Sequence, residues 1–191
     1  MNKKGLLVSI SMSAFAVAFV AAVPRPAMGD HGQYSEQLKQ HAGELVRVVR
    51  ESTRRFRDVN QAEAEGYHLL FGCVSGPDDG AMGLHFVNME LVMDPALDPQ
   101  KPEIVIYEPL PNGGRKLIGA DFLVFAEAWH AKNTATPELG GQLMHLIESP
   151  NRYGLPAFYT LHVWAWKPNP TGAFVNWHSD VSCEQFDGSQ H

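Results

Sequence analysis

Histidine is abundant in this chain, and several histidines lie in apolar segments whose side chains can face the interior. The sequence contains nine histidines among 191 residues. Imidazole nitrogens are common ligands of transition metals, and two histidines together with a carboxylate form the ligand set of many zinc sites. Histidines that project from different strands of one sheet are therefore candidates for a metal site.

Four residues form the predicted metal site. His85 and His162 lie in short segments that are typical of strands, and Glu108 ends a third such segment. His145 follows Gln142 by three residues, so the two share a side of a helix if this stretch is helical. A divalent ion such as zinc or copper would be bound if the fold brings together His85, Glu108, His145 and His162. For each histidine alone, a hydrogen bond to a core carbonyl group is the structural alternative.

A second hypothesis comes from the aromatic residues of the last predicted strand, residues 157–166. Alternation places Thr160, His162, Trp164 and Trp166 on one face of this strand and aliphatic residues on the other. Such a face lines a cavity or the inside of a barrel, which favours non-catalytic binding of a small apolar or aromatic molecule, with histidines as polar contacts. The predicted lining residues are Phe122, Phe158, Tyr159, Trp164 and Trp166.

The sequence lacks the motifs that mark several well-known enzyme classes. It contains no His-Glu-x-x-His helix, no Cys-x-x-Cys pair, no glycine-rich phosphate loop and no Gly-x-Ser-x-Gly turn. A metal with an open coordination position can polarise a substrate or activate water. The candidate ligand residues do not identify a particular reaction. Methionine is a soft copper ligand, and Met82, Met89, Met93 and Met144 lie near candidate histidines, although core packing is their usual role.

The first 29 residues have the layout of a secretory signal peptide. Two lysines precede an apolar run over residues 6–23, and prolines and small residues follow it. The length of the run also permits a membrane anchor, but its serines and the prolines after it favour cleavage. We therefore expect export to the periplasm or the exterior, with no membrane anchor left. The mature chain, residues 30–191, is expected to be one domain with its core at about 35–185.

Export changes the interpretation of the two cysteines, Cys73 and Cys183. An oxidising compartment lets thiols pair, so a disulfide is the prediction, with a pair of thiolate metal ligands as the alternative. A disulfide that closes a loop of about 110 residues would stabilise the fold by roughly 4–5 kcal/mol through the entropy of the unfolded chain.

The charge of the chain argues against a nucleic-acid partner. The formal net charge is −6 and the isoelectric point is about 5.8, whereas binding to phosphate backbones depends on clustered Lys and Arg. The expected partner is a metal ion or a small molecule. A third hypothesis is a basic helix face that meets an acidic partner, although a solvated face is its ordinary explanation. The residues of this face are Arg47, Arg50, Arg54, Arg55 and Arg57.

The elements that must position these residues follow from hydrophobic periodicity. Apolar residues at three- and four-residue steps predict an amphipathic helix from Ser35 to about residue 65. Asn112-Gly113 between two β-rich runs predicts a hairpin. The other predicted elements are strands at 67–74, 83–88, 103–108, 116–125 and 157–166, and a short helix at 137–147. We therefore expect an α+β fold: an antiparallel sheet, open or partly closed into a barrel, with the N-terminal amphipathic helix packed on it.

Three segments of the chain carry a resemblance to known sequences. They are residues 80–88, 102–109 and 153–170. Together they resemble an uncharacterised family of exported bacterial proteins, over about residues 67–183. The resemblance implies an exported single domain and no particular activity, substrate or cofactor. In that family Asn-Pro often follows the late tryptophan, where this chain has His178 after Trp177, which argues against His178 as a shared ligand.

Overall fold

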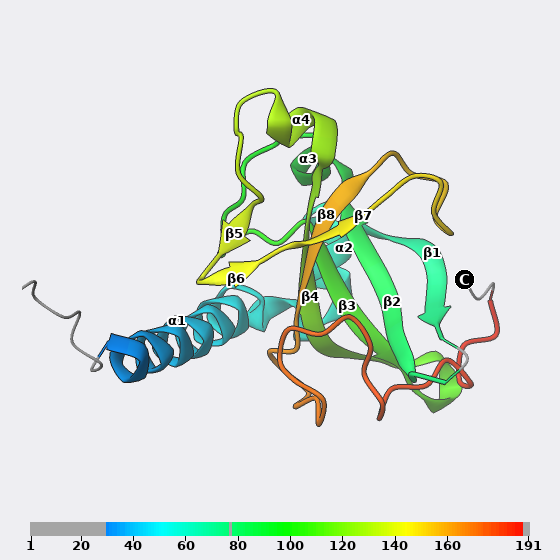
Figure 1. Ribbon diagram of the computed structural model, residues 1–191. Coiled ribbons are helices and arrows are strands. Elements are labelled where there is room, and N and C mark those ends of the chain that lie inside the picture. Colours follow the sequence, from blue (N-terminus) through cyan, green and yellow to red (C-terminus); the bar gives the residue numbers. More distant parts are fainter. Residues whose placement is uncertain (1–29, 77, 189–191) are drawn as a thin grey trace, which may run out of the picture.

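The structure, a computed structural model, describes residues 30–76 and 78–188 (Figure 1). The predicted signal peptide therefore lies outside the described residues. The helical elements are α1 (Asp30–Ser52), η1 (Arg54–Arg57), α2 (Val59–Ala64), α3 (Met89–Val92), η2 (Pro111–Gly113) and α4 (Ala126–His130). The strands are β1 (Tyr67–Ser75), β2 (Ala81–Asn88), β3 (Ile104–Pro109), β4 (Arg115–Phe125), β5 (Glu138–Leu139), β6 (Gln142–Leu143), β7 (His145–Ile147) and β8 (Phe158–Val163). Within the described part of the chain, no helix combines the length and apolar character needed to cross a membrane.

The architecture is α+β, as the sequence predicts. Six strands form one antiparallel sheet in the order β1-β2-β3-β4-β8-β7, and β5 and β6 form a separate small ladder. The sheet does not close into a barrel, because its two edge strands, β1 and β7, pair only with β2 and β8 among the described strands. Of the two expected forms, the sheet takes the open one.

The predicted N-terminal helix is present, but it is interrupted at Thr53. The Thr53 hydroxyl donates a hydrogen bond to the carbonyl of Val49 at 2.6 Å, and the chain continues as the short helix η1. Helix α2 then starts anew at Asp58, whose side chain accepts a hydrogen bond from the Asn60 N–H. This interruption turns Phe56, which is 1% exposed, into the core beside the sheet.

The β3–β4 hairpin confirms the strongest turn signal in the sequence. Its turn contains Asn112 at φ 64° and Gly113 at φ 74°, the left-handed conformation that Asn and Gly adopt most readily. In contrast, the predicted helix at 137–147 is wrong, because this segment forms β5, β6 and β7. Gly140 and Gly141, at φ 56° and 76°, make a tight turn between β5 and β6, a conformation that a helix does not contain.

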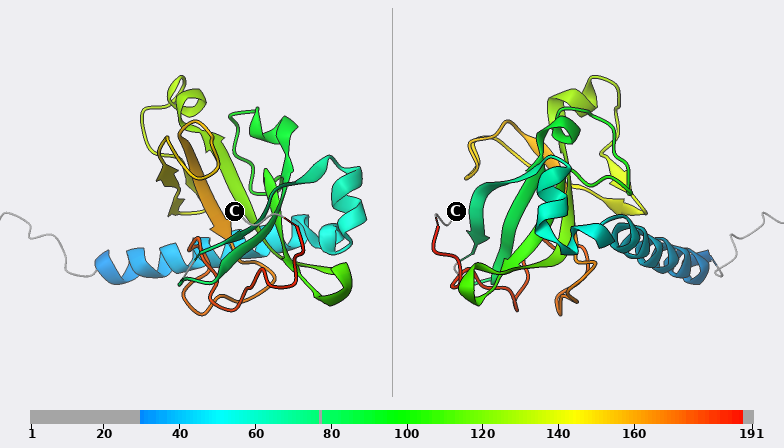
Figure 2. Two further views of the ribbon diagram at one scale, coloured as in Figure 1. Left: turned by 90° about the vertical axis from the view of Figure 1, so that its right-hand side faces the viewer. Right: turned by 180° about the vertical axis from the view of Figure 1, so that it is seen from behind.

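The two faces of the sheet differ: helices pack on one, and buried polar residues lie on the other. On β4 and β8, Phe122, Val124 and Leu161 belong to a core cluster with Leu45 and Val49 of α1. Seen from behind, α2 lies in front of the sheet, whereas much of α1 extends sideways beyond it (Figure 2, right). Because successive side chains of a strand alternate between faces, the residues next to these in sequence face away from the helices. That second face carries the buried polar residues Asp121, Thr160 and His162.

A disulfide joins β1 to the C-terminal segment. Cys73 and Cys183 are bonded, with their Cα atoms 5.8 Å apart and a sequence separation of 110. The predicted disulfide is thus confirmed, and the alternative of two thiolate ligands is wrong. The same segment is held to β2 by two backbone hydrogen bonds between Ala81 and His178, of 3.2 and 3.1 Å. A disulfide is typical of proteins that leave the reducing cytosol.

Glu103 is a buried carboxyl group that couples the stability of this fold to pH. It is 2% exposed, and its Oε2 accepts a hydrogen bond from the backbone N–H of Leu123 at 3.1 Å. Burial raises the pKa of Glu103 to about 8, and the carboxylates of Asp121 and Asp94 act in the same direction. The folded protein therefore holds this proton more tightly than the unfolded chain.

We predict that the free energy of unfolding falls as the pH rises from 4.5 through about 8. These are the pKa values of Glu103 in the unfolded chain and in the folded protein, respectively. The stabilisation is complete below the unfolded pKa and is lost as the pH passes the folded pKa, because the folded state binds the proton more strongly. The expected slope is about 1 kcal/mol per pH unit. Urea unfolding between about pH 7 and 8, where ordinary carboxyl groups no longer titrate, measures it.

Two variants separate Glu103 from other titrating groups. Glu103→Gln should remove the slope, whereas Glu184→Gln, at an exposed position, should keep it. A wild-type stability that stays constant or increases over this pH range would contradict the assignment.

Candidate metal centre

His85, Asp121 and His162 come together on the face of the sheet that turns away from α1 and α2. One ligand atom of each lies within 4.8 Å of the other two. The three residues are 6%, 3% and 2% exposed. They lie on β2, β4 and β8 respectively, so segments that are far apart in the sequence supply them. Two imidazoles and one carboxylate at these distances can hold a metal ion.

The strand register explains why these side chains meet. Asp121 and His162 are direct cross-strand partners, and Ile104 of β3 is the partner of Asp121 on the other side. Val87 of β2 continues the same row as the partner of Ile104. His85 lies two residues before Val87 and therefore shares its face. Cross-strand partners point to one face, so all of these side chains project to the same side of the sheet.

Hydrogen bonds hold two of the three candidate ligands in place. Oδ1 of Asp121 accepts hydrogen bonds from the Thr160 hydroxyl at 2.6 Å and from the Leu161 N–H at 3.1 Å. His85 Nδ1 lies 3.2 Å from the carbonyl of Gly83 and donates its proton there. This tautomer leaves the lone pair on Nε2, and metal-binding histidines are commonly oriented by such a bond from their other nitrogen.

His162 differs, because neither of its ring nitrogens makes a hydrogen bond of ordinary geometry among the described residues. The neighbouring side chain is that of Asn176, which favours the protonated imidazole and whose Oδ1 also lacks such a bond. Its Nδ1 lies 3.6 Å from Oδ1 of Asp121, which is longer than a hydrogen bond. Its ring contacts are the edge of His85, with centroids 5.8 Å apart, and the ring of Trp164 at 5.7 Å. A buried polar atom without a partner costs about 1–3 kcal/mol and is rare in native proteins. The observation points to a partner that is not part of the chain.

Burial sets the charge state of the cluster. It lowers the pKa of His85 to about 4 and that of His162 to about 3. It raises the pKa of Asp121 to about 6, while His85 and the Thr160 hydrogen bond oppose this change. Near neutral pH both imidazoles are thus uncharged and the carboxyl group is mostly ionised, which is the protonation state that a metal requires of its ligands.

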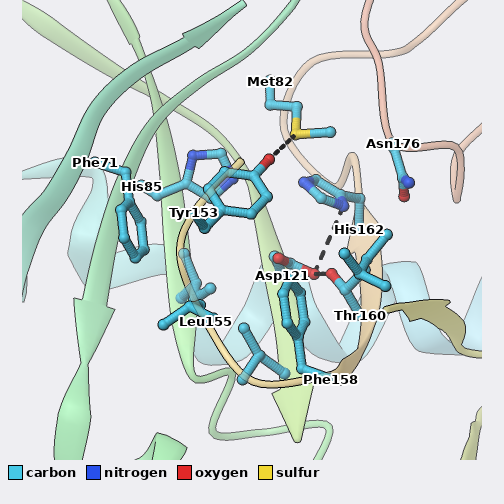
Figure 3. A pocket seen from close by; sticks show the side chains of 13 residues that line it. Phe71, Met82, His85, Asp121, Tyr153, Leu155, Phe158, Thr160, His162 and Asn176 are labelled. Atoms are coloured by element: carbon cyan, nitrogen blue, oxygen red, sulfur yellow. Dashed lines mark hydrogen bonds and ion pairs between the residues drawn. The ribbon is translucent and has the colours of Figure 1, made fainter. Parts of the chain in front are cut away.

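A small cavity of about 50 Å³ adjoins the cluster (Figure 3). Its wall is mainly apolar, and Thr160 and Asn176 are further polar residues in it. The other lining residues besides the cluster itself are Phe71, Met82, Ile104, Leu123, Ile147, Tyr153, Leu155 and Phe158. The volume is enough for a few water-sized groups, since about 10–15 Å³ of such space holds one water. No lysine or arginine is among the lining residues that the structure describes.

The segment between β7 and β8 forms one wall of the cavity through Tyr153 and Leu155. Oδ1 of Asn151 accepts hydrogen bonds from the N–H groups of both residues, at 3.2 and 3.3 Å. Arg152 ties the segment to β1 by a hydrogen bond to the carbonyl of Ser75 at 3.1 Å. The Tyr153 hydroxyl points toward Met82 and donates to its sulfur at 3.7 Å (Figure 3).

Phe71 lines the cavity from a distorted part of β1. The register of β1 against β2 is irregular between Leu69 and Cys73, and Phe71 has a φ of 68°. Bulky residues rarely adopt this left-handed conformation, and strain of this kind is concentrated at functional sites. Its result here is that the Phe71 ring contacts Tyr153, with ring centroids 5.4 Å apart.

The structure brings together two of the four residues of the predicted metal site. His85 and His162 meet, but Glu108 lies elsewhere and forms an ion pair with Lys167 at 2.5 Å. His145 is exposed on the edge strand β7, outside the three-residue cluster. Asp121 takes the carboxylate position instead. A sequence signal for it exists, because Asp121 is the acidic residue inside the apolar strand Arg115–Phe125, and a buried acid needs a partner.

Most of the aromatic residues predicted to line a ligand cavity lie outside it. Phe158 lines the cavity, whereas Phe122 and Tyr159 pack on the helix side. Trp164 contacts His162 and His178 without lining the cavity. Trp166 donates a hydrogen bond to the Thr53 hydroxyl. Strand β8 ends at Val163, so its alternation does not continue to the last tryptophan.

Comparisons of this chain with protein-family models, with curated proteins and with solved structures found no match. Its function must therefore be argued from the geometry of the cluster and the cavity.

We predict that His162→Leu increases the free energy of unfolding of the metal-free protein by about 1–2 kcal/mol. Leucine has a similar volume and removes two buried nitrogen atoms that have no partner. Urea unfolding in the presence of a chelator measures the change.

The matched control is His178→Leu. Its Nε2 also lacks a partner among the described residues, but its Nδ1 accepts the Asp180 N–H at 3.2 Å, so this replacement should destabilise the protein. A His162→Leu protein less stable than the wild type would instead identify His162 as an ordinary core residue.

Proposed function

We propose that this protein binds one divalent transition-metal ion through His85, Asp121 and His162. The observation that carries the proposal is the buried His162 ring, whose two nitrogens lack partners, within 4.8 Å of a carboxylate oxygen and a second imidazole nitrogen. A bound ion would satisfy a nitrogen of each histidine and offset the negative charge of Asp121. This role explains a cluster that would otherwise only cost stability.

The ligand types favour an ion of the zinc class. Calcium and magnesium prefer sets of oxygen ligands, whereas imidazole nitrogens suit zinc, copper, iron and nickel. Structural zinc sites usually have four protein ligands, whereas catalytic sites have three and keep a position open. Three ligands beside a cavity match the second pattern. A reaction at this site therefore remains compatible with the geometry, and Lewis-acid activation is the chemistry that it would support.

Binding of an aromatic molecule without a metal is the second candidate function. The apolar lining of the cavity favours it, with Phe71, Leu155 and Phe158 as examples. However, the volume of about 50 Å³ is far below the roughly 300–1,000 Å³ of typical small-molecule sites. The size of the cavity thus favours the metal ion over an aromatic ligand.

We further propose that the protein acts outside the cytosol, in the periplasm or as a secreted protein. The Cys73–Cys183 disulfide is typical of an oxidising compartment, and the layout of residues 1–29 is that of an export signal.

The prediction is stoichiometric binding of zinc or cobalt(II) that depends on the cluster. His85→Ala, Asp121→Asn and His162→Ala should each weaken metal affinity by at least about 100-fold, since even residues that only orient ligands contribute 10–100-fold. Isothermal titration and metal analysis of untagged protein measure this. At a free concentration about 100 times Kd, the ion should stabilise the folded state by roughly 2.7 kcal/mol.

His145→Ala provides the matched control, because His145 is an exposed histidine on the same sheet and lies outside the cluster. It should bind the metal as the wild type does. The proposal fails if the wild-type protein binds none of zinc, cobalt(II), iron(II) and copper, or if His145→Ala loses the metal and His162→Ala keeps it.

A further inference from the structure

We infer that the metal centre accepts a small exogenous monoanion of two or three non-hydrogen atoms, and that the Tyr153 hydroxyl donates a hydrogen bond to it. The inference rests on the proposed function, because the anion would coordinate the metal ion. It identifies the class of ligand that the cavity admits and the residue that selects it.

The first step of the argument is coordination number. Ions of the zinc class take four or more ligands, and the chain supplies three at the cluster. The backbone of the sheet lies behind these three side chains, while the cavity lies in front of them (Figure 3). An additional ligand would therefore occupy the cavity.

The second step is charge. A divalent ion with one carboxylate and two neutral imidazoles carries a net charge of about +1. Asp121 is the acidic residue among the described cavity residues, and the rest of the wall is uncharged. An unbalanced charge is unfavourable in an apolar environment. A monoanion at the open position would make the centre neutral, which a neutral ligand or a dianion would not.

The third step is size. The cavity volume of about 50 Å³ accommodates only a few water-sized groups, at about 10–15 Å³ each. Azide, cyanide and similar short anions fit this space. An aromatic carboxylate does not fit unless Tyr153 and Leu155 move aside, and the hydrogen bonds from their backbones to Asn151 hold them in place.

The fourth step is hydrogen bonding. Tyr153 presents its hydroxyl to the cavity, and the acceptor of this group is the thioether of Met82 at 3.7 Å, a weak acceptor. An anion would be a much stronger hydrogen-bond acceptor than this sulfur. Burial raises the pKa of Tyr153, so the phenol keeps its proton. The Asn176 side chain, whose Oδ1 has no partner in the described structure, lies on the wall as a second polar group.

The test uses the cobalt(II)-loaded protein and azide as the probe. We predict that azide changes the visible spectrum of the cobalt centre in a saturable way, whereas benzoate, a larger monoanion, does not. Tyr153→Phe keeps the ring in the wall and removes the hydroxyl group. On cobalt-loaded protein it should weaken azide binding by about 10–100-fold, the usual effect of losing a hydrogen bond to a charged group.

Tyr159→Phe is the matched control, because the Tyr159 hydroxyl contacts His130 on the other side of the sheet at 2.9 Å. It should bind azide like the wild type. Failure to bind cobalt(II) together with zinc, iron(II) and copper would overturn the proposed function itself. A cobalt spectrum that azide does not change would leave the metal centre standing and overturn this inference. Equal binding of benzoate would overturn the size limit, and unchanged azide affinity in Tyr153→Phe would overturn the role of Tyr153.

Discussion

The pairing of β4 with β8 places Asp121 directly opposite His162, and the rest of the site depends on this register. A slip of one residue would turn Asp121 toward the helices and bring an apolar neighbour into the site. Two hydrogen bonds to Asp121 Oδ1, from the Thr160 hydroxyl and the Leu161 N–H, join the carboxylate to β8. The packing of Phe122 and Leu161 against α1 holds the opposite face in the same register.

The cluster works against the stability of the fold that carries it. His162 is buried with two unpartnered nitrogens, and burial disfavours the charged forms of His85 and Asp121. The helix-side core and the Cys73–Cys183 disulfide offset this cost. A metal ion would remove much of it, so metal binding and folding are expected to be coupled.

The cavity is assembled from parts of the chain that have little else in common. A bulged strand supplies Phe71, the start of β2 supplies Met82, and the β7–β8 connection supplies Tyr153. The resulting wall is apolar apart from a few polar groups (Figure 3). An apolar wall would strengthen electrostatic interactions at the proposed metal position.

Local pattern was sufficient for the α+β class, the β3–β4 hairpin and the presence of His85 and His162 on strands, because these follow from alternation and turn chemistry over a few residues. The disulfide followed from there being two cysteines in a chain expected to be exported. The break at Thr53, the strands in place of a helix at 137–147 and the choice of Asp121 over Glu108 depended on the tertiary structure. Strand order and register bring Asp121 beside the two histidines, whereas Lys167 pairs with Glu108 elsewhere. Residues that meet across four strands are related by register, and no local sequence pattern specifies which strands become neighbours.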